Sequence, residues 1–237
     1  HLYGQSSDME KIDILAKKYD VFIIEDAAQG VGVHFNNTHV GIFGDVGILS
    51  YYGNKTITCG EGGIVLTNNQ EIAEKCYMLK NHGRSQKGIF KHESIGFNFA
   101  FTEMQAAIGI AQMHKLKKII SRKLKINNLY QKELGFISDL IPIQIDKRCD
   151  PVYWFTSFLT EKNEDLTKYL KKQGIQTRKF FYPLHRQPCY NDNNFVKFSN
   201  CPNSVKAYQM GISLPSSYNL SKANQDKVIS EIISFFK

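Results

Sequence analysis

The segment Gly44–Asn68, GDVGILSYYGNKTITCGEGGIVLTN, places one lysine between two strand-like stretches. The stretches Gly44–Tyr52 and Gly62–Asn68 are rich in β-branched and aromatic residues and are bounded by Gly or Asn, so both are predicted to be strands. Lys55 lies in the glycine-flanked turn between them, five residues after Ser50. We therefore expect a sheet that presents a lysine beyond the end of one strand.

A buried strand is expected upstream of this segment. VFIIE (Val21–Glu25) is a short continuous apolar run, typical of parallel sheets covered on both faces, and it ends at Asp26. The apolar residues of Ser7–Tyr19 recur at helical spacing, with Asp8 among the candidate N-caps, and Glu71–Lys80 also predicts a helix. The first half of the chain therefore has the pattern of an α/β domain.

The second half begins with a long helical pattern over Thr102–Lys125, which Thr102 caps and which is expected to continue towards Tyr130. Strands are then predicted at Ile141–Ile145, Val152–Thr160 and Arg178–Tyr182, and a helix at Glu164–Gln173. No linker rich in Pro, Gly or Ser separates the halves, so we expect the boundary inside the long helix, dividing the chain into domains 1–122 and 123–237.

Composition limits the class of protein. The 237 residues are 42% hydrophobic and 22% charged, and no apolar run approaches the roughly 20 residues of a membrane helix, so no membrane span is expected. The five cysteines are odd in number and form no CxxC pair, a pattern that fits neither a disulfide framework nor a zinc site. We interpret them as reduced thiols of a cytoplasmic protein.

The net charge of +8 suits nucleic acid, a membrane surface or a small polyanion such as a phosphorylated cofactor. The densest basic segment, His114–Lys125, places its apolar residues on one helical stripe and most of its lysines on the other side. No aromatic residues interleave with these lysines, so a solvated helix face is favoured over a nucleic-acid patch.

Three polar residues are expected to converge, because ligands of open α/β sheets gather at the carboxyl ends of the strands. They are Asp26, Ser50 and Lys55. A lysine shielded from water has a lowered pKa and can attack a carbonyl carbon as a neutral amine. Enzymes that bind pyridoxal phosphate (PLP) use such a lysine. In these enzymes an Asp keeps the pyridine nitrogen of PLP protonated. An Asp that ends a strand is also a common cap, and a Lys after a strand is usually solvated, so the pattern alone leaves both interpretations open.

Several sequence motifs resemble those of one protein family. In order, the chain contains HLYGQSSDM, IIEDAAQGVG, the Gly44–Asn68 segment, LKNHGR, GFNFAFTEMQAAIGIAQ and FFYPLHRQPCY. Together they resemble the DegT family of PLP-dependent nucleotide-sugar aminotransferases over the whole chain. YGNKTIT and GISLPSSYNLS are most similar to its GDP-perosamine synthase group. The resemblance implies the C-terminal part of a fold type I PLP-dependent transferase, with a mainly parallel sheet in the large, PLP-binding domain and a smaller α/β C-terminal domain.

The resemblance also implies roles for five residues around the cofactor. Lys55 would bond covalently to PLP and, once released, move protons as acid and base, while Asp26 would pair with the pyridine nitrogen. Ala28 would pack against the ring and Gln29 would lie by its phenolic oxygen. Ser50 would bind the phosphate.

Other implied roles depend on a partner or a substrate. Asn98, in the GFN motif, would reach the phosphate of a neighbouring subunit's cofactor, which implies a homodimer with shared active sites. Tyr182 and His185 resemble positions near the sugar nucleotide, although a structural role in their turn is equally open. The chain departs from the family at Phe99–Phe101, where a basic residue is usual.

The implied activity is transfer of an amino group, with glutamate as the expected donor, to a 4-keto-6-deoxy nucleotide sugar, giving a 4-amino sugar for glycan biosynthesis. One alternative is a PLP-dependent sugar dehydratase of the same fold, in which histidine typically replaces the lysine; Lys55 argues against it. The other is a non-catalytic or inactive fragment. The intact set of site residues argues against that, whereas the start at His1, without the N-terminal portion of the family, argues for it and suggests truncation.

Overall fold

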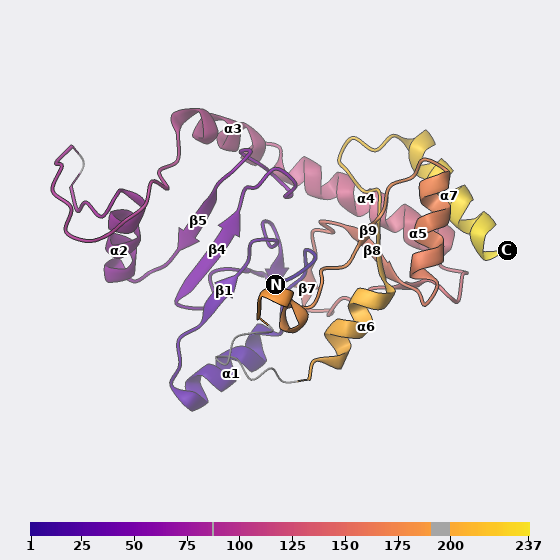
Figure 1. Ribbon diagram of the computed structural model, residues 1–237, viewed down its shortest axis with the longest axis horizontal. Helices are drawn as coiled ribbons and strands as arrows, with labels where there is room; N and C mark the ends of the chain where they lie inside the picture. The colour runs from indigo at the N-terminus through magenta and orange to yellow at the C-terminus, as the bar shows by residue number, and fades with distance from the viewer. Residues whose placement is uncertain (87, 191–199) are drawn as a thin grey trace. The chain divides into compact units, whose positions relative to one another are not determined.

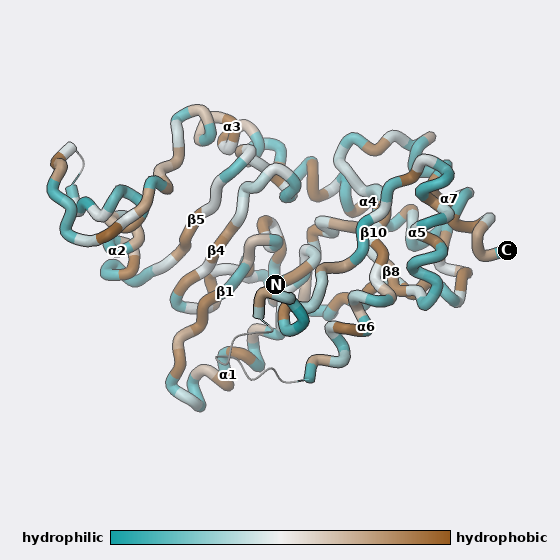
Figure 2. Tube along the Cα trace, viewed as in Figure 1, coloured by the Kyte–Doolittle hydropathy of each residue, from teal (hydrophilic) through white to brown (hydrophobic). Residues whose placement is uncertain are grey.

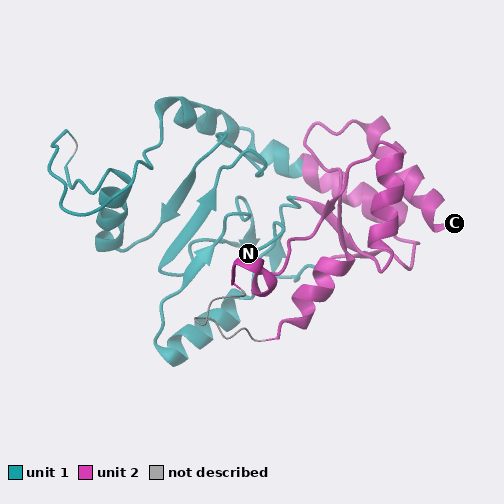
Figure 3. Ribbon diagram, in the orientation of Figure 1, with its two compact units in different colours: residues 1–121, 145–154 teal, residues 122–144, 155–237 magenta. Residues whose placement is uncertain are grey.

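The computed structural model describes residues 1–86, 88–190 and 200–237, which form two compact units (Figure 3). The first unit contains residues 1–121 and 145–154, and the second contains the described residues of 122–144 and 155–237. The boundary between residues 121 and 122 falls inside helix α4 (Leu116–Leu134). Residues 145–154 follow that boundary in the sequence and nevertheless belong to the first unit.

The first unit contains a three-stranded sheet in the order β1-β4-β5 (Figure 1). Strand β1 pairs parallel to β4, and β5 pairs antiparallel to β4; a smaller antiparallel sheet has the order β3-β2-β7. Helices accompany these strands, so the α/β class is confirmed. The elements are α1 (Met9–Tyr19), β1 (Ile24–Asp26), β2 (His34–Phe35), β3 (Thr38–His39), β4 (Val46–Ser50), β5 (Gly63–Leu66), α2 (Gln70–Lys80), α3 (Glu103–Met113) and β7 (Cys149–Asp150).

Strand β1 differs from the expected buried strand. It spans Ile24–Asp26 rather than Val21–Glu25, and Phe22 is 83% exposed. Figure 2 shows hydrophobic residues along the segment that enters β1. Because side chains of a strand alternate between two faces, the described residues cover only the face to which Glu25 points, and Ile24 and Asp26 are exposed.

The prediction of one helix over Thr102–Lys125 is wrong, because α3 ends at Met113 and α4 begins at Leu116. The N–H group of Lys115 bonds to the carbonyl of Gln112, three residues back, at 3.0 Å. This three-residue spacing interrupts the four-residue hydrogen-bond pattern of the α-helix. Apolar residues recur at helical spacing on both sides of the break, so the periodicity of the sequence does not indicate that the helix is interrupted there.

Helix N-caps follow the sequence closely. Asp8 accepts a hydrogen bond from Lys11 N–H at 3.3 Å and caps α1. Thr102 and Gln105 form a capping box at the start of α3. These local side chains satisfy N–H groups that have no partner within the helix, which is why both starts could be predicted.

The second unit contains a four-stranded antiparallel sheet in the order β6-β8-β10-β9. Its core includes the fully buried side chains of Tyr130, Leu166 and Ile212. The predicted strands are present but shorter than expected. The elements are β6 (Ile141–Pro142), β8 (Thr156–Leu159), α5 (Asn163–Lys172), β9 (Arg178–Lys179), the 3-10 helices η1 (Leu184–Arg186) and η2 (Pro188–Tyr190), α6 (Pro202–Met210), β10 (Gly211–Leu214) and α7 (Lys222–Phe236).

Within the described ranges, none of the helices combines the length and apolar character needed to cross a membrane.

Candidate active site

The carboxyl ends of β1 and β4 meet at one edge of the sheet in the first unit. Asp26 is the last residue of β1 and lies opposite Ile48 of the parallel strand β4. Ser50 ends β4 two residues later. The register therefore brings the Asp26 and Ser50 positions to the same edge, as the sequence predicted.

One oxygen of Asp26 is held by its own loop. Oδ1 accepts a hydrogen bond from the backbone N–H of Ala28 at 3.0 Å. The residue is exposed, and Oδ2 has no hydrogen-bond partner among the residues that the structure describes. The carboxylate is thus oriented by the chain and retains an oxygen with which to accept a proton or an N–H group.

Glu25, which sequence reasoning did not select, anchors the loop beside this edge. Its carboxylate is buried, at 3% residue exposure, and accepts hydrogen bonds from the backbone N–H groups of Gly41 (2.7 Å), Phe43 (2.6 Å) and Gly44 (2.8 Å). A Cβ atom at Gly47 of β4 would overlap the Gly41 carbonyl, so this loop crosses closely over the strand. Side chains alternate between the two faces of a strand, so Glu25 points away from Asp26 and towards the covered face of β1. This alternation is the sequence signal from which the burial of Glu25 could have been predicted.

The imidazole of His1 completes the Glu25 network. His1 Nδ1 accepts a hydrogen bond from Ser7 N–H at 3.1 Å, so Nε2 carries the ring proton and donates to Glu25 Oε2 at 3.0 Å. The His1 side chain is 2% exposed. A fourth donor therefore joins the three backbone N–H groups around one buried carboxylate.

Gln29 lies half-buried in the loop after β1. Its Oε1 accepts a hydrogen bond from the backbone N–H of Tyr3 at 2.7 Å. Tyr3 itself adopts a positive φ of 56°. With the amide oxygen occupied, the amide nitrogen remains as the donor end of the side chain.

Lys55 occupies the turn that follows β4. Its N–H bonds to the carbonyl of Tyr52 at 3.0 Å, and its ammonium lies 4.6 Å from the centroid of the Trp154 ring. Burial lowers the pKa of Lys55, while the Asp26 carboxylate acts in the opposite direction and raises it. The two side chains therefore lie within electrostatic range, and a larger fraction of Lys55 is a neutral, nucleophilic amine than in a free lysine.

Ser50 and the glycine-rich turn complete the surroundings of Lys55. Ser50 Oγ accepts a hydrogen bond from Tyr52 N–H at 3.3 Å and keeps its own hydrogen to donate. The carbonyl of Glu61 accepts from Gln105 Nε2 at 3.1 Å, so Glu61 joins the turn to α3 through its backbone. Gly62 has a φ of 139°, and a Cβ there would overlap the ring of Phe101, which packs against the turn.

The remaining predicted residues lie elsewhere. Asn98 is exposed in the loop between α2 and α3, where its backbone forms a bridge with Asn81; no hydrogen bond of the described residues joins it to Asp26 or Lys55. Tyr182 and His185 belong to the second unit. The Tyr182 ring packs edge-on against Tyr208 at 5.1 Å between centroids.

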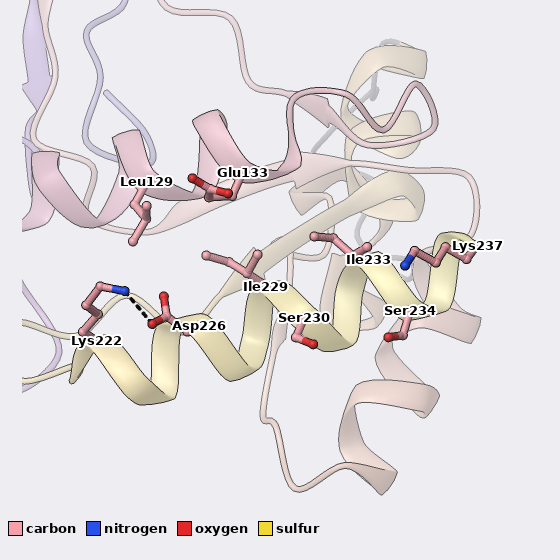
Figure 4. A pocket seen from close by; sticks show the side chains of 9 residues that line it. All are labelled: Leu129, Glu133, Lys222, Asp226, Ile229, Ser230, Ile233, Ser234 and Lys237. Carbon is pink, nitrogen blue, oxygen red and sulfur yellow. Dashed lines mark hydrogen bonds and ion pairs between the residues drawn. The ribbon is translucent and has the colours of Figure 1, made fainter.

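A pocket of the second unit contains none of the predicted site residues. It lies between α4 and α7 and is lined by Leu129, Glu133, residues of α7 and the C-terminal Lys237 (Figure 4). Its Lys222 and Asp226 form an ion pair with each other at 2.6 Å. Among the described residues, moreover, no group of three or more His, Cys, Asp or Glu side chains is arranged to hold a metal ion. The predicted residues Asp26 and Ser50 lie instead at the sheet edge, with Lys55 in the turn that follows it.

The fold and these groups define a class: an α/β protein with an amine, a carboxylate, a hydroxyl and an amide near the carboxyl edge of its sheet. The sequence profile of the DegT/DnrJ/EryC1/StrS aminotransferase family matches residues 1–233. The chain belongs to this family.

Individual relatives agree with this assignment. The chain is 37% identical to the GDP-perosamine synthase of Escherichia coli O157:H7 and 34% identical to the pleiotropic regulatory protein of Geobacillus stearothermophilus; each match covers 100% of this chain and 64% of the relative. The crystal structure of S. venezuelae DesV in complex with a ketimine intermediate is similar, with a TM-score of 0.92 and 29% identity, over 100% of this chain and 64% of that one. The chain therefore spans under two thirds of the length of these proteins.

Proposed function

We propose that the protein to which this chain belongs is a PLP-dependent aminotransferase. It transfers an amino group, with glutamate as the expected donor, to a 4-keto-6-deoxy nucleotide sugar, and the 4-amino product serves polysaccharide biosynthesis. The observation that carries the proposal is the environment of Lys55, a half-buried amine of lowered pKa within electrostatic range of Asp26. The similarity to GDP-perosamine synthase supports the choice of sugar and of the C4 position.

The side chains at the sheet edge fit PLP by their chemistry. PLP has an aldehyde, a basic ring nitrogen, a phenolic oxygen and a phosphate, and Lys55, Asp26, Gln29 and Ser50 offer an amine, a carboxylate, an N–H donor and an O–H donor. When bound, PLP supplies an electrophilic carbon for amines and a ring that accepts electron density.

Each residue then has a defined task. Lys55 would hold PLP through its neutral amine, which would bond to the aldehyde carbon with loss of water, and once released it would serve as the base and acid for the proton of the reacting carbon. Asp26, oriented by Ala28 N–H, would hold a proton on the ring nitrogen. Gln29, oriented by Tyr3 N–H, donates to the phenolic oxygen. Ser50 donates to the phosphate, and Ala28 packs against the ring.

Three further assignments belong to the proposal. Asn98 would contact the phosphate of the cofactor in a second subunit, and such a residue must be exposed on its own subunit. Asn98 is exposed, which supports a homodimer with shared active sites. Tyr182 and His185 would contact the sugar nucleotide. The location would be the cytoplasm, which suits the thiols of Cys59, Cys76 and Cys149.

The alternatives have less support. A dehydratase of this fold typically has histidine at the position of Lys55. A regulatory role matches the name of the Geobacillus stearothermophilus relative, but it gives no reason for an amine of lowered pKa beside a carboxylate.

The experiment uses the full natural chain with PLP, glutamate and, in turn, GDP-, UDP- and dTDP-linked 4-keto-6-deoxy sugars, and detects the amino sugar by mass spectrometry. We expect amination of the GDP-linked sugar. Lys55→Ala should abolish it, whereas Lys118→Ala, at an exposed lysine of α4, should not. Amination of only a simple keto acid would refute the substrate class, and product from the Lys55→Ala variant would refute the mechanism.

A further inference from the structure

Trp154 makes two contacts with the Lys55 turn. It is the single tryptophan of the sequence and is 3% exposed. Its indole Nε1–H donates a hydrogen bond to the backbone carbonyl of Asn54 at 2.7 Å, and its ring lies 4.6 Å from Lys55 Nζ. One side chain therefore contacts both the peptide before the lysine and the far end of the lysine side chain.

The backbone holds Trp154 firmly in this place. Tyr153 has a positive φ of 49°, a conformation that is uncommon for a bulky residue and persists only where its surroundings enforce it. Val152 N–H bonds to the Gly4 carbonyl at 2.9 Å. Gly4 has a φ of 76°, and a Cβ at this position would lie 2.9 Å from Trp154 N, so the glycine permits the close approach.

We propose that Trp154 is a positioning residue for Lys55: its indole N–H fixes the peptide from which the lysine extends, and its ring sets the path of the side chain and excludes water from one side of the amine. This proposal rests on the proposed function of Lys55 for its catalytic meaning, but the contact itself does not depend on it. Its contacts with the Asn54 carbonyl and with Lys55 Nζ both bear on the lysine, so we infer that it acts through Lys55.

A purely structural tryptophan would also be buried and would also need a partner for its N–H group. The ring's position separates the two cases. The ring face lies against a cationic amine rather than only against apolar side chains, and burial is the main cause of the lowered pKa of Lys55. Removing the ring should therefore change the titration of Lys55 itself.

The test measures the acylation rate of Lys55 against pH in the full natural chain without PLP, by peptide mass spectrometry, with the exposed Lys118 as the internal reference. Trp154→Leu removes the ring and admits water. Because burial is the main cause of the lowered pKa of Lys55, the gain of water should outweigh the lost attraction between the ring and the ammonium, and the pKa should rise. At pH 8, its acylation relative to Lys118 should fall about threefold, because the neutral fraction of an amine falls as its pKa rises. Trp154→Phe keeps a ring and should restore the rate to within about twofold of the natural protein.

Phe35→Leu is the matched control, because Phe35 is a buried aromatic residue of the same unit whose ring contacts a different cation, Arg148. It should leave the titration of Lys55 unchanged. Circular dichroism checks folding, and Trp154→Met carries the same prediction if the Leu variant unfolds. An unchanged Lys55 profile in a folded Leu or Met variant, or an equal change in Phe35→Leu, would overturn the proposal. Because the readout needs no cofactor, its result is separate from the success or failure of the aminotransferase assay.

Discussion

The substitution Glu25→Gln tests whether the buried carboxylate organises the sheet edge. In the natural chain, Oε1 accepts from Phe43 and Gly44, and Oε2 accepts from Gly41 and His1. A glutamine amide retains one oxygen but turns its NH₂ group towards the other two donors. Because leaving a buried donor unsatisfied costs about 1–3 kcal/mol, and two donors lose their partner, we expect the free energy of unfolding to fall by about 2–6 kcal/mol.

Urea denaturation of the full natural chain measures this loss, which is a large part of the roughly 5–15 kcal/mol that stabilises a typical protein. Glu71→Gln, at an exposed acid in the first turn of α2, is the control and should change stability by less than about 1 kcal/mol. A Glu25→Gln variant as stable as this control would refute the reasoning, because the carboxylate would then be replaceable by a neutral amide.

Three other predictions concern stability. Burial lowers the pKa of Lys123 to about 8, from an ordinary value of 10.5, so the unfolded chain binds more protons between these pH values. Stability should therefore rise with pH from about 8 to 10.5, and Lys123→Met should flatten this rise in urea titrations at several pH values. Thr102→Ala removes the capping box of α3 and should cost about 1 kcal/mol by the same assay; no loss would show that the cap is dispensable. Gly62→Ala should lower the free energy of unfolding by more than about 1 kcal/mol, since the φ of Gly62 is positive and the Phe101 ring fills the space a Cβ would need. Adding Phe101→Ala should relieve part of this loss of stability. Equal losses with and without Phe101→Ala would exclude the steric cause.

The convergence of Asp26 and Ser50 could be predicted because it follows from a short-range rule. Two parallel strands end at one edge, so a polar residue that ends each strand must lie there. Helix starts at Asp8 and Thr102 were predictable for a similar reason, since a cap acts within three residues. Lys55 belongs to the same group, because its turn directly follows β4.

Other features depend on residues far apart in the sequence. Trp154 contacts a carbonyl 100 residues away, and no spacing rule joins it to Asn54. The role of Glu25 depends on a loop 16 to 19 residues later whose N–H groups bond to its carboxylate, and no local pattern indicates that contact. The break after Met113 is a change in hydrogen-bond spacing that leaves the apolar pattern intact, so composition could not reveal it.

The proposed function requires that Lys55 be the amine to which PLP bonds. The direct measurement incubates the full natural chain with PLP, reduces it with borohydride and maps the modified peptides by mass spectrometry, with Lys55→Ala as the control. We predict the added pyridoxyl-phosphate group on Lys55, at a PLP concentration that leaves the exposed Lys117 and Lys118 unmodified. A protein in which Lys55 stays unmodified, or carries no more label than those surface lysines, would contradict the account.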